Sequence, residues 1–247
     1  MTVAAPAARC AIAVIAKAPR PGHVKTRLQA ILSPDEAAAL GAAFLRDTLG
    51  NLIQAAAVVP IAPFVAYAPA GEEARFDGLL PDGVELLLAD GADGEAAGVD
   101  GFGRVLLHTT RALLARGFAA ACVLGADSPT LPTAELVRAV RVLLGAEADA
   151  VLGPAEDGGY WLLGLRQPHP APFAGIAWST DSVADATRTR LRDAGLSTVE
   201  LAPWYDLDDR AALARLVGEL ARPGPAYPAP HTAGLVRQLG IAARLRA

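Results

Sequence analysis

Short apolar runs of strand length alternate with longer helix-like segments along most of the chain. The runs are rich in Ile, Val, Leu and Ala, as expected of strands buried on both faces of a parallel sheet. We expect strands at residues 10–16, 61–68, 84–89, 119–125, 150–153, 160–165 and 198–201. We expect helices at residues 33–57, 103–116, 133–144, 181–194 and 208–220. The alternation predicts βαβ units and an α/β fold, with a mostly parallel central sheet between two helical layers.

The first long helix has a clear start signal. Ser33-Pro-Asp-Glu36 has the spacing of a capping box, with proline at the first helical position. At the other end of the chain, a Pro-rich connector begins at Arg222 and leads to a last short helix that ends at Arg246. We therefore divide the chain into a flexible N-terminus at 1–9, one domain at 10–221, and the connector with its helix at 222–247.

Composition narrows the class of protein. The 247 residues are 53% hydrophobic and carry a formal charge of −4, which suits one large domain with a sizeable core and argues against general nucleic-acid binding. The apolar runs are too short to span a membrane, and the N-terminus lacks the basic region of a signal peptide, so we expect a cytoplasmic protein. Cys10 and Cys122 lie in strand-like runs and are expected to be buried free thiols.

A basic loop follows the first predicted strand. It carries Lys17, Arg20, Lys25 and Arg27 and no acidic residue, and it holds the only two lysines among the 22 basic residues. In open α/β sheets, ligands bind beyond the carboxyl ends of the strands, so these cations are expected to bind a nucleotide's phosphates. Gly22 would let the backbone approach them. The alternative is a solvated surface loop.

Carboxylates follow the later strands. Asp127 stands at the end of a hydrophobic strand, where a bare charge is costly unless it is paired or metal-bound. We expect it to bind Mg²⁺ or Mn²⁺, with Asp206 or Asp208 as a further ligand. Asp208, just before a predicted helix, could instead serve only as its cap.

A glycine turn separates two of the predicted strands. Asp157-Gly158-Gly159 alone would suit a hairpin turn. The neighbouring Tyr160 and Trp161 favour a second role, in which backbone amides approach a sugar or a base. The sequence contains no Ser/His/Asp elbow, P-loop or dinucleotide-binding glycine motif, so hydrolase, P-loop and dinucleotide hypotheses lose support.

Together these motifs resemble a known family. The basic loop up to Leu28, Gly125-Ala-Asp-Ser-Pro129, the 153–160 turn, Trp178-Ser-Thr180 and Trp204-Tyr-Asp-Leu-Asp208 look like bacterial GT-A-type glycosyltransferases of the arsenosugar-biosynthesis and radical-SAM/selenodomain-associated kind. The resemblance covers about residues 10–220. The loop and the Asp-x-Pro segment are also similar to small guanylyltransferases that act on phospholactate or the molybdenum cofactor.

The resemblance implies a single-domain, Rossmann-like fold of the nucleotide-diphospho-sugar transferase type. It adds a phosphate-side role for Thr26 and Arg104, and substrate contacts for Trp178, Ser179 and Thr180 beside the Gly158–Tyr160 turn. The segment Asp100-Gly-Phe-Gly-Arg104 keeps the acid and the arginine of the family pattern but not its middle residues. A contact to the acceptor or to the base is therefore expected to differ here.

Three functions are consistent with these residues. In sugar transfer, Asp127 and a divalent metal hold the donor's diphosphate, and Asp157 or Glu156 acts as base toward a small-molecule acceptor. In nucleotidyl transfer, Lys25 and Arg27 hold the departing pyrophosphate of GTP or CTP. The third is a nucleotide-binding module without catalysis, which the retained carboxylates disfavour.

Overall fold

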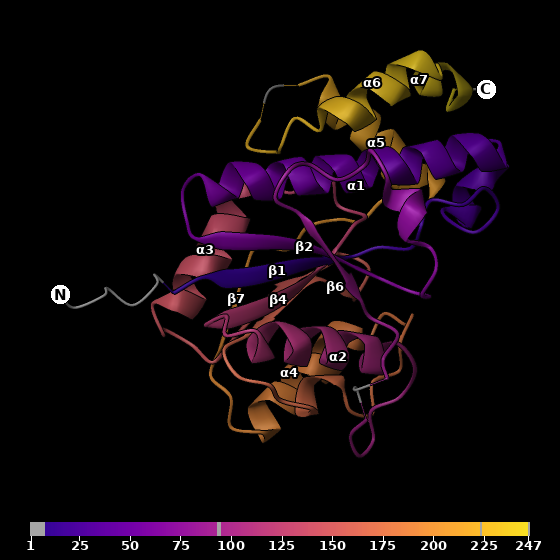
Figure 1. Ribbon diagram of the computed structural model, residues 1–247. Coiled ribbons are helices and arrows are strands. Elements are labelled where there is room, and N and C mark those ends of the chain that lie inside the picture. Colours follow the sequence, from indigo (N-terminus) through magenta and orange to yellow (C-terminus); the bar gives the residue numbers. More distant parts are fainter. Residues whose placement is uncertain (1–7, 93–94, 223, 247) are drawn as a thin grey trace.

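The structure, a computed structural model, describes residues 8–92, 95–222 and 224–246. Its centre is a seven-stranded sheet with the strand order β3-β2-β1-β4-β6-β5-β7 (Figure 1). The strands are β1 Cys10–Ile15, β2 Ile61–Tyr67, β3 Glu85–Leu88, β4 Ala120–Gly125, β5 Ala150–Pro154, β6 Tyr160–Leu165 and β7 Thr198–Glu200. The predicted strands are confirmed to within a few residues at their ends.

One strand runs against the others. β6 pairs antiparallel with both β4 and β5, whereas the remaining neighbours pair in parallel. The mostly parallel sheet is therefore confirmed. Because β6 is reversed, its first residue, Tyr160, lies at the same edge of the sheet as the last residues of the other strands. Side chains from both kinds of strand end can thus meet at this edge.

Helices cover both faces of the sheet. They are α1 Pro34–Ala56, α2 Gly101–Ala115, α3 Thr133–Leu144, α4 Val183–Asp193, α5 Arg210–Leu220, α6 Pro230–Gln238 and α7 Ile241–Arg244, with short 3₁₀ turns at Thr26–Ala30, Glu73–Phe76 and Ala171–Phe173. Figure 1 shows α1 on one face and α2 and α4 on the other. α3 packs on the same face as α1, and α5 to α7 form a further layer outside α1. The single α/β domain with a central sheet between two helical layers is confirmed, and α5 to α7 are an addition to it.

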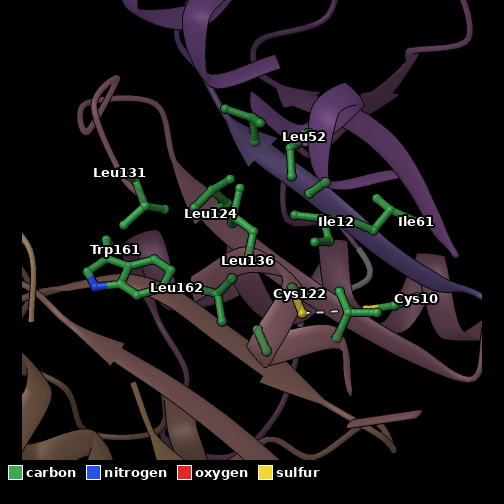
Figure 2. Close-up of a cluster of buried hydrophobic side chains, with 14 of the residues drawn as sticks. Cys10, Ile12, Leu52, Ile61, Cys122, Leu124, Leu131, Leu136, Trp161 and Leu162 are labelled. Atoms are coloured by element: carbon green, nitrogen blue, oxygen red, sulfur yellow. Dashed lines mark hydrogen bonds between the residues drawn. The ribbon is translucent and has the colours of Figure 1, made fainter. Parts of the chain in front are cut away.

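The main core lies between the sheet and the α1/α3 layer (Figure 2). Ile12, Leu52 and Leu136 are fully buried there, because the strands and both helices each turn an apolar face inward. Cys10 and Cys122 lie on neighbouring strands with their Sγ atoms 3.7 Å apart, and both are free and buried. This confirms their prediction as small hydrophobic residues of the core.

The ends of the chain differ in what the structure describes. Residues 1–7 of the predicted flexible N-terminus lie outside the described residues. At the other end, the last segment forms two helices, α6 and α7, where we expected one, because Gly240 takes a left-handed conformation (φ 60°) that interrupts the helix. In the described part of the chain, no helix is long and apolar enough to cross a membrane.

The α1 start is confirmed in detail. Ser33 Oγ accepts from the backbone N–H of Glu36, and Glu36 Oε2 accepts from the N–H of Ser33, which completes the capping box. The Glu36 carboxylate also accepts two hydrogen bonds from the guanidinium of Arg244 in α7, at 2.7 and 2.8 Å. The same carboxylate therefore starts α1 and ties the C-terminal helix to it.

Candidate functional site

A pocket of about 480 Å³ opens at the carboxyl edge of the sheet, beyond the ends of β1, β2 and β4. This volume lies within the roughly 300–1,000 Å³ of small-molecule sites. The basic loop contributes Lys17, Pro19, His23, Val24, Lys25, Thr26 and Arg27 to its lining. Asp127 and Asp208 also line it, as do Phe102 and Val105 of α2. The predicted cations and carboxylates thus meet in one concave site.

Two acidic loops are held together by hydrogen bonds. The backbone N–H of Leu207 donates to the carbonyl of Asp127 at 2.9 Å, and Ser128 Oγ donates to the carbonyl of Tyr205 at 2.9 Å. Both bonds join the loop after β4 to the segment between β7 and α5. The carboxylates of these two loops are therefore positioned by backbone contacts made directly beside them.

The β5–β6 turn is joined to the same segment. Trp204 donates its backbone N–H to the carbonyl of Pro154 at 3.2 Å, and the N–H of Glu156 donates to the carbonyl of Trp204 at 3.0 Å. Asp157 follows in the turn, and its Oδ1 accepts from the N–H of Gly159 at 2.9 Å. Three loops that are distant in sequence therefore bring carboxylates to one place.

The four carboxylates of Asp127, Asp157, Asp206 and Asp208 are called the acidic group below, and Lys25 reaches into it. Its Nζ lies 2.7 Å from Asp127 Oδ1, 2.8 Å from Asp208 Oδ1 and 2.8 Å from the carbonyl oxygen of Leu207. The side chain is only 7% exposed, and Nζ also lies 5.3 Å from the ring centroid of Phe44. An ammonium has three N–H donors, and these three oxygens can accept them all. In this arrangement Lys25 has no donor left for a phosphate.

Charge and backbone geometry support this contact. Burial alone would lower the pKa of Lys25, but the nearby carboxylates of Asp127 and Asp208 outweigh burial and raise it above its ordinary value. The residue has a left-handed backbone (φ 49°, ψ 40°), which costs a non-glycine residue about 1–3 kcal/mol. Such a conformation persists only where surrounding contacts determine it, as the three oxygens do here.

Asp206 is the carboxylate with the most perturbed environment in the site. Burial, followed by the negative charges of Asp157 and Asp208, raises its pKa to about 6, and Asp127 adds a smaller contribution. Its main electrostatic neighbours are therefore other acids. A cation placed in this group would relieve their repulsion.

The oxygen atoms at Lys25 fit a hard divalent cation. Carboxylate and carbonyl oxygens are the donors that Mg²⁺ and Mn²⁺ prefer, and the set formed by Asp127, Asp208 and Leu207 already surrounds one positive charge. In the described residues, no three His, Cys, Asp or Glu side chains are arranged to hold a metal as they stand.

The predicted alternative role of Asp208 as a helix cap is wrong. Asp209 is the residue that caps α5, because its Oδ1 accepts from the N–H of Ala212 at 2.8 Å. Asp208 instead turns toward Lys25. The helix begins two residues after Asp208, and this offset leaves its side chain available to the site.

The remaining phosphate-side residues divide into two groups. Lys17, Thr26 and Arg27 line the pocket. Arg20 instead pairs with Glu72 at 3.4 Å, and it does not line the pocket. Gly22 (φ 78°) likewise lies outside the lining, where its φ serves the turn of the loop. Arg104 lies outside it too, and its Nε donates to the carbonyl of Val99 at 3.2 Å.

The predicted substrate residues lie close together beside the pocket. Asp157-Gly158-Gly159 is the β5–β6 hairpin turn, and the carbonyl of Gly158 accepts the N–H of Ala184 at the start of α4 at 2.8 Å. Trp178 and Tyr160 contact each other at a centroid separation of 6.5 Å. Ser179 has a left-handed backbone, and Thr180 Oγ1 donates to the carbonyl of Ala177. None of these side chains lines the pocket itself.

Sequence reasoning missed three contributors. Phe102 is 46% exposed and lines the pocket, although only the unusual Gly-Phe-Gly segment marked this region. Ser128 and Tyr205 join the two acidic loops through a long-range hydrogen bond. No local pattern signals such a bond, because its two residues are 77 positions apart in the sequence.

Comparisons with solved structures agree with this architecture. A "putative nucleotide-diphospho-sugar transferase" from Desulfovibrio desulfuricans G20 matches with a TM-score of 0.77 and 27% identity, and the match covers 97% of each chain. A CMP:2-keto-3-deoxy-manno-octonic acid synthetase complexed with CTP has a TM-score of 0.51 at 12% identity, over 87% of this chain and 99% of that one. A search of curated proteins gives no match.

A third solved structure, a cytidylyltransferase from Leptospira borgpetersenii serovar Hardjo-bovis, has a TM-score of 0.51 at 10% identity and covers 96% of this chain and 97% of that one. The last two likenesses identify the fold alone. The chain thus has the fold of nucleotide-using transferase enzymes.

The family model covers the middle of the chain. It matches residues 48–180, more than half of the sequence, and this stretch includes Asp127, Asp157 and Trp178. The basic loop and Asp206 lie outside the matched residues. The chain belongs to the family described as "Uncharacterized protein conserved in bacteria (DUF2064)".

Proposed function

We propose that this protein is a divalent-metal-dependent transferase that moves a sugar from a nucleotide-diphospho-sugar to a small-molecule acceptor. One observation carries the proposal: the basic loop and the carboxylates of Asp127 and Asp208 line the same pocket of about 480 Å³ at the carboxyl edge of the sheet. Full-length likeness to a protein described as a nucleotide-diphospho-sugar transferase supports sugar as the transferred group, as does the resemblance to arsenosugar-type glycosyltransferases.

The donor's phosphates would lie against the basic loop. Lys17, Thr26 and Arg27 line the pocket and can donate to phosphate oxygens, and a guanidinium can do so with two N–H groups at once. Arg20, Gly22 and Arg104 are proposed to support this region from outside the lining. Gly22 would contribute to the turn of the loop, and Arg20 and Arg104 to the positive potential around it.

Asp127, Asp206 and Asp208 would hold the Mg²⁺ or Mn²⁺. When bound, the ion would offset the charge that develops on the departing diphosphate. For the oxygens of Asp127 and Asp208 to become available, Lys25 must leave them. Its released ammonium then has three donors for the diphosphate, which gives Lys25 a catalytic role that depends on donor binding.

The acceptor must lose a proton as it attacks. In the proposed step, the acceptor oxygen forms a bond to the anomeric carbon while the bond from that carbon to the diphosphate oxygen breaks. The electron pair leaves with the nucleoside diphosphate, and the hydroxyl proton passes to Asp157. Glu156 is the weaker base candidate, because Arg215 binds both of its carboxylate oxygens.

Nucleotidyl transfer is the second candidate, and the density of cations in the loop favours it. Lys17 and Arg27 line the pocket together, and Lys25 would join them once released. Three cations suit the triphosphate of GTP or CTP better than a diphosphate. In that reaction, an oxygen of a small phosphorylated substrate attacks the α-phosphorus and pyrophosphate leaves.

A thermal-shift experiment tests the proposal. The protein is heated with Mn²⁺ and either nucleoside triphosphates or UDP-, GDP- and dTDP-sugars, each with and without the metal. A bound donor near 100 times its Kd should raise the Tm by about 5–10 °C. Asp127→Asn should lose the metal-dependent part of this shift, whereas Asp82→Asn, a matched change at an exposed residue outside the pocket, should retain it.

The outcomes separate the candidates. Stabilisation by triphosphates alone would exclude sugar transfer in favour of nucleotidyl transfer. A shift with nucleotide sugars that does not require metal would contradict the role of the carboxylates. No response to any nucleotide would overturn both transferase proposals.

A further inference from the structure

Lys25 places a positive charge where the proposed metal would bind. Its Nζ lies 2.7 Å from an oxygen of Asp127 and 2.8 Å from an oxygen of Asp208, the two carboxylates that line the pocket. The carbonyl oxygen of Leu207 lies 2.8 Å from the same Nζ. An ammonium and a divalent cation repel each other, so they cannot both bind these oxygens at such distances. The chain therefore supplies its own cation to Asp127 and Asp208.

The surroundings of Lys25 hold its side chain in this position. The side chain is 7% exposed, and its Nζ lies 5.3 Å from the ring centroid of Phe44 in α1. Its backbone is left-handed (φ 49°), and its carbonyl accepts the N–H of Leu28 at 3.0 Å at the start of the 3₁₀ turn Thr26–Ala30. A non-glycine residue keeps such a backbone only where its contacts determine it. The ammonium is therefore fixed at the carboxylates rather than free in solvent.

The chain offers a direct comparison, because Lys17 is its only other lysine and lines the same pocket. Lys17 is exposed, and among the described residues it forms no ion pair. It can therefore meet an incoming phosphate without leaving a partner. Lys25 can do so only by breaking its contacts with Asp127 and Asp208, which frees both carboxylates at the same moment.

We propose that Lys25 is an internal competitor of the metal, which keeps divalent cations off Asp127 and Asp208 until a nucleotide is bound. The inference rests on the proposed function and adds the order in which its ligands bind. The phosphates of a nucleotide supply Lys25 with new oxygens in the pocket that it already lines, and the two carboxylates then become available. Nucleotide and metal therefore bind cooperatively, and each raises the affinity for the other by the same factor.

Charge balance gives the reason why each ligand alone binds weakly. If a metal alone displaced Lys25, the ammonium would lie near a divalent ion without a carboxylate partner, which is unfavourable away from water. If a nucleotide alone drew Lys25 to its phosphates, Asp127 and Asp208 would be left to repel Asp206. When both bind, the phosphates pair with the ammonium and the metal pairs with the carboxylates. Couplings between two ligands are typically about 5- to 150-fold.

Lysine NMR follows Lys25 directly, because two lysines give only two side-chain signals. The protein is grown with lysine labelled with ¹³C at Cε, and Lys17→Met assigns the signals by removing one of them. The Phe44 ring and the low exposure of Lys25 should separate its signal from that of the exposed Lys17. Mg²⁺ alone should leave the Lys25 signal in place. Mg²⁺ with UDP, GDP or dTDP should move it away from its position in the free protein.

Calorimetry with Mn²⁺ tests the competition. Lys25→Met keeps an unbranched side chain and removes the ammonium, so it should bind Mn²⁺ without nucleotide about tenfold more tightly than wild type. The same variant should bind UDP, GDP or dTDP more weakly, because a donor to the phosphates is lost. Lys17→Met is the matched control, since it removes the same charge from the same pocket at an exposed residue. It should also weaken nucleotide binding but change the Mn²⁺ affinity by less than about twofold.

The two measurements separate competition by Lys25 from the proposed function. If Lys25→Met does not bind Mn²⁺ more tightly, if Lys17→Met gains as much, or if Mg²⁺ alone moves the Lys25 signal, Lys25 does not compete with the metal. Metal-dependent nucleotide binding would then still support the transferase. If no nucleotide binds in calorimetry or moves the Lys25 signal, the proposed function itself fails. The labelled lysine keeps the test decisive even if Lys25→Met does not fold.

Discussion

Two regions of the molecule hold an aspartate away from bulk solvent, fully buried at Asp47 and half-buried at Asp206, and its surroundings differ between the two. Asp47 on α1 is fully buried, and its two oxygens accept the backbone N–H groups of His231 and Thr232 at 3.0 and 2.7 Å. These donors belong to the first turn of α6, where a helix end leaves N–H groups without internal partners and favours negative charge. Asp47 therefore caps α6 from another helix, in place of Ala229, which has no capping side chain.

Asp206, in the acidic group, has other acids as its main electrostatic neighbours. Its pKa is raised to about 6 by burial and by neighbouring acids, whereas the chain gives Asp47 two donors. The difference teaches how to tell a structural carboxylate from a functional one. The chain satisfies the first by itself, and we propose that a bound cation satisfies the second.

We expect the largest effect on stability from removing the buried carboxylate of Asp47. Asp47→Ala leaves two N–H groups at the start of α6 without acceptors, so we expect a loss of about 2–4 kcal/mol in the free energy of unfolding. Urea unfolding measures this loss. Asp47→Asn should recover part of it, because the amide oxygen can still accept one bond. A loss no greater than that of Asp82→Asn would contradict the capping role.

In the acidic group, we expect removal of a carboxylate to stabilise the protein rather than destabilise it. Without metal, Asp206→Asn removes one of four mutually repelling charges, and we expect a gain on the order of 1 kcal/mol after allowing for solvent screening of this partly exposed site. The same variant should bind Mn²⁺ more weakly in calorimetry. Destabilisation by Asp206→Asn in metal-free buffer would show that the chain already satisfies this carboxylate.

We expect the smallest effect at Glu36, a half-buried carboxylate that is paired with Arg244. The hydrogen bonds from Arg244 and then Ser33 lower the pKa of Glu36 to about 2. A depressed pKa stabilises the fold above the unfolded value of about 4.5, and this stabilisation is lost as the pH falls toward 2. Glu36→Gln should therefore be slightly less stable than wild type at pH 6, and the difference should shrink progressively as the pH falls from 4.5 toward 2. A pH-independent difference in urea midpoints would contradict this assignment.

Local chemistry allowed much of the fold to be predicted. The strands are short apolar runs and the α1 start is a capping box, so both follow from residues close together in sequence. The grouping of the basic loop with Asp127 was also predictable, because parallel strands end at one edge of the sheet. The reversed direction of β6 was not predicted, although the residues Asp157-Gly-Gly before it are suited to a hairpin turn.

The contacts within the site needed the tertiary structure. The sequence determined that cations follow β1 and that carboxylates follow later strands. Only the fold decided that Lys25 occupies the oxygens of Asp127 and Asp208, that Asp209 rather than Asp208 caps α5, and that Arg20 turns away to Glu72. Strand ends are set by local hydrophobicity and turn chemistry. Which charged side chains pair depends on long-range packing, since the partner of Lys25 at Asp208 lies 183 residues away.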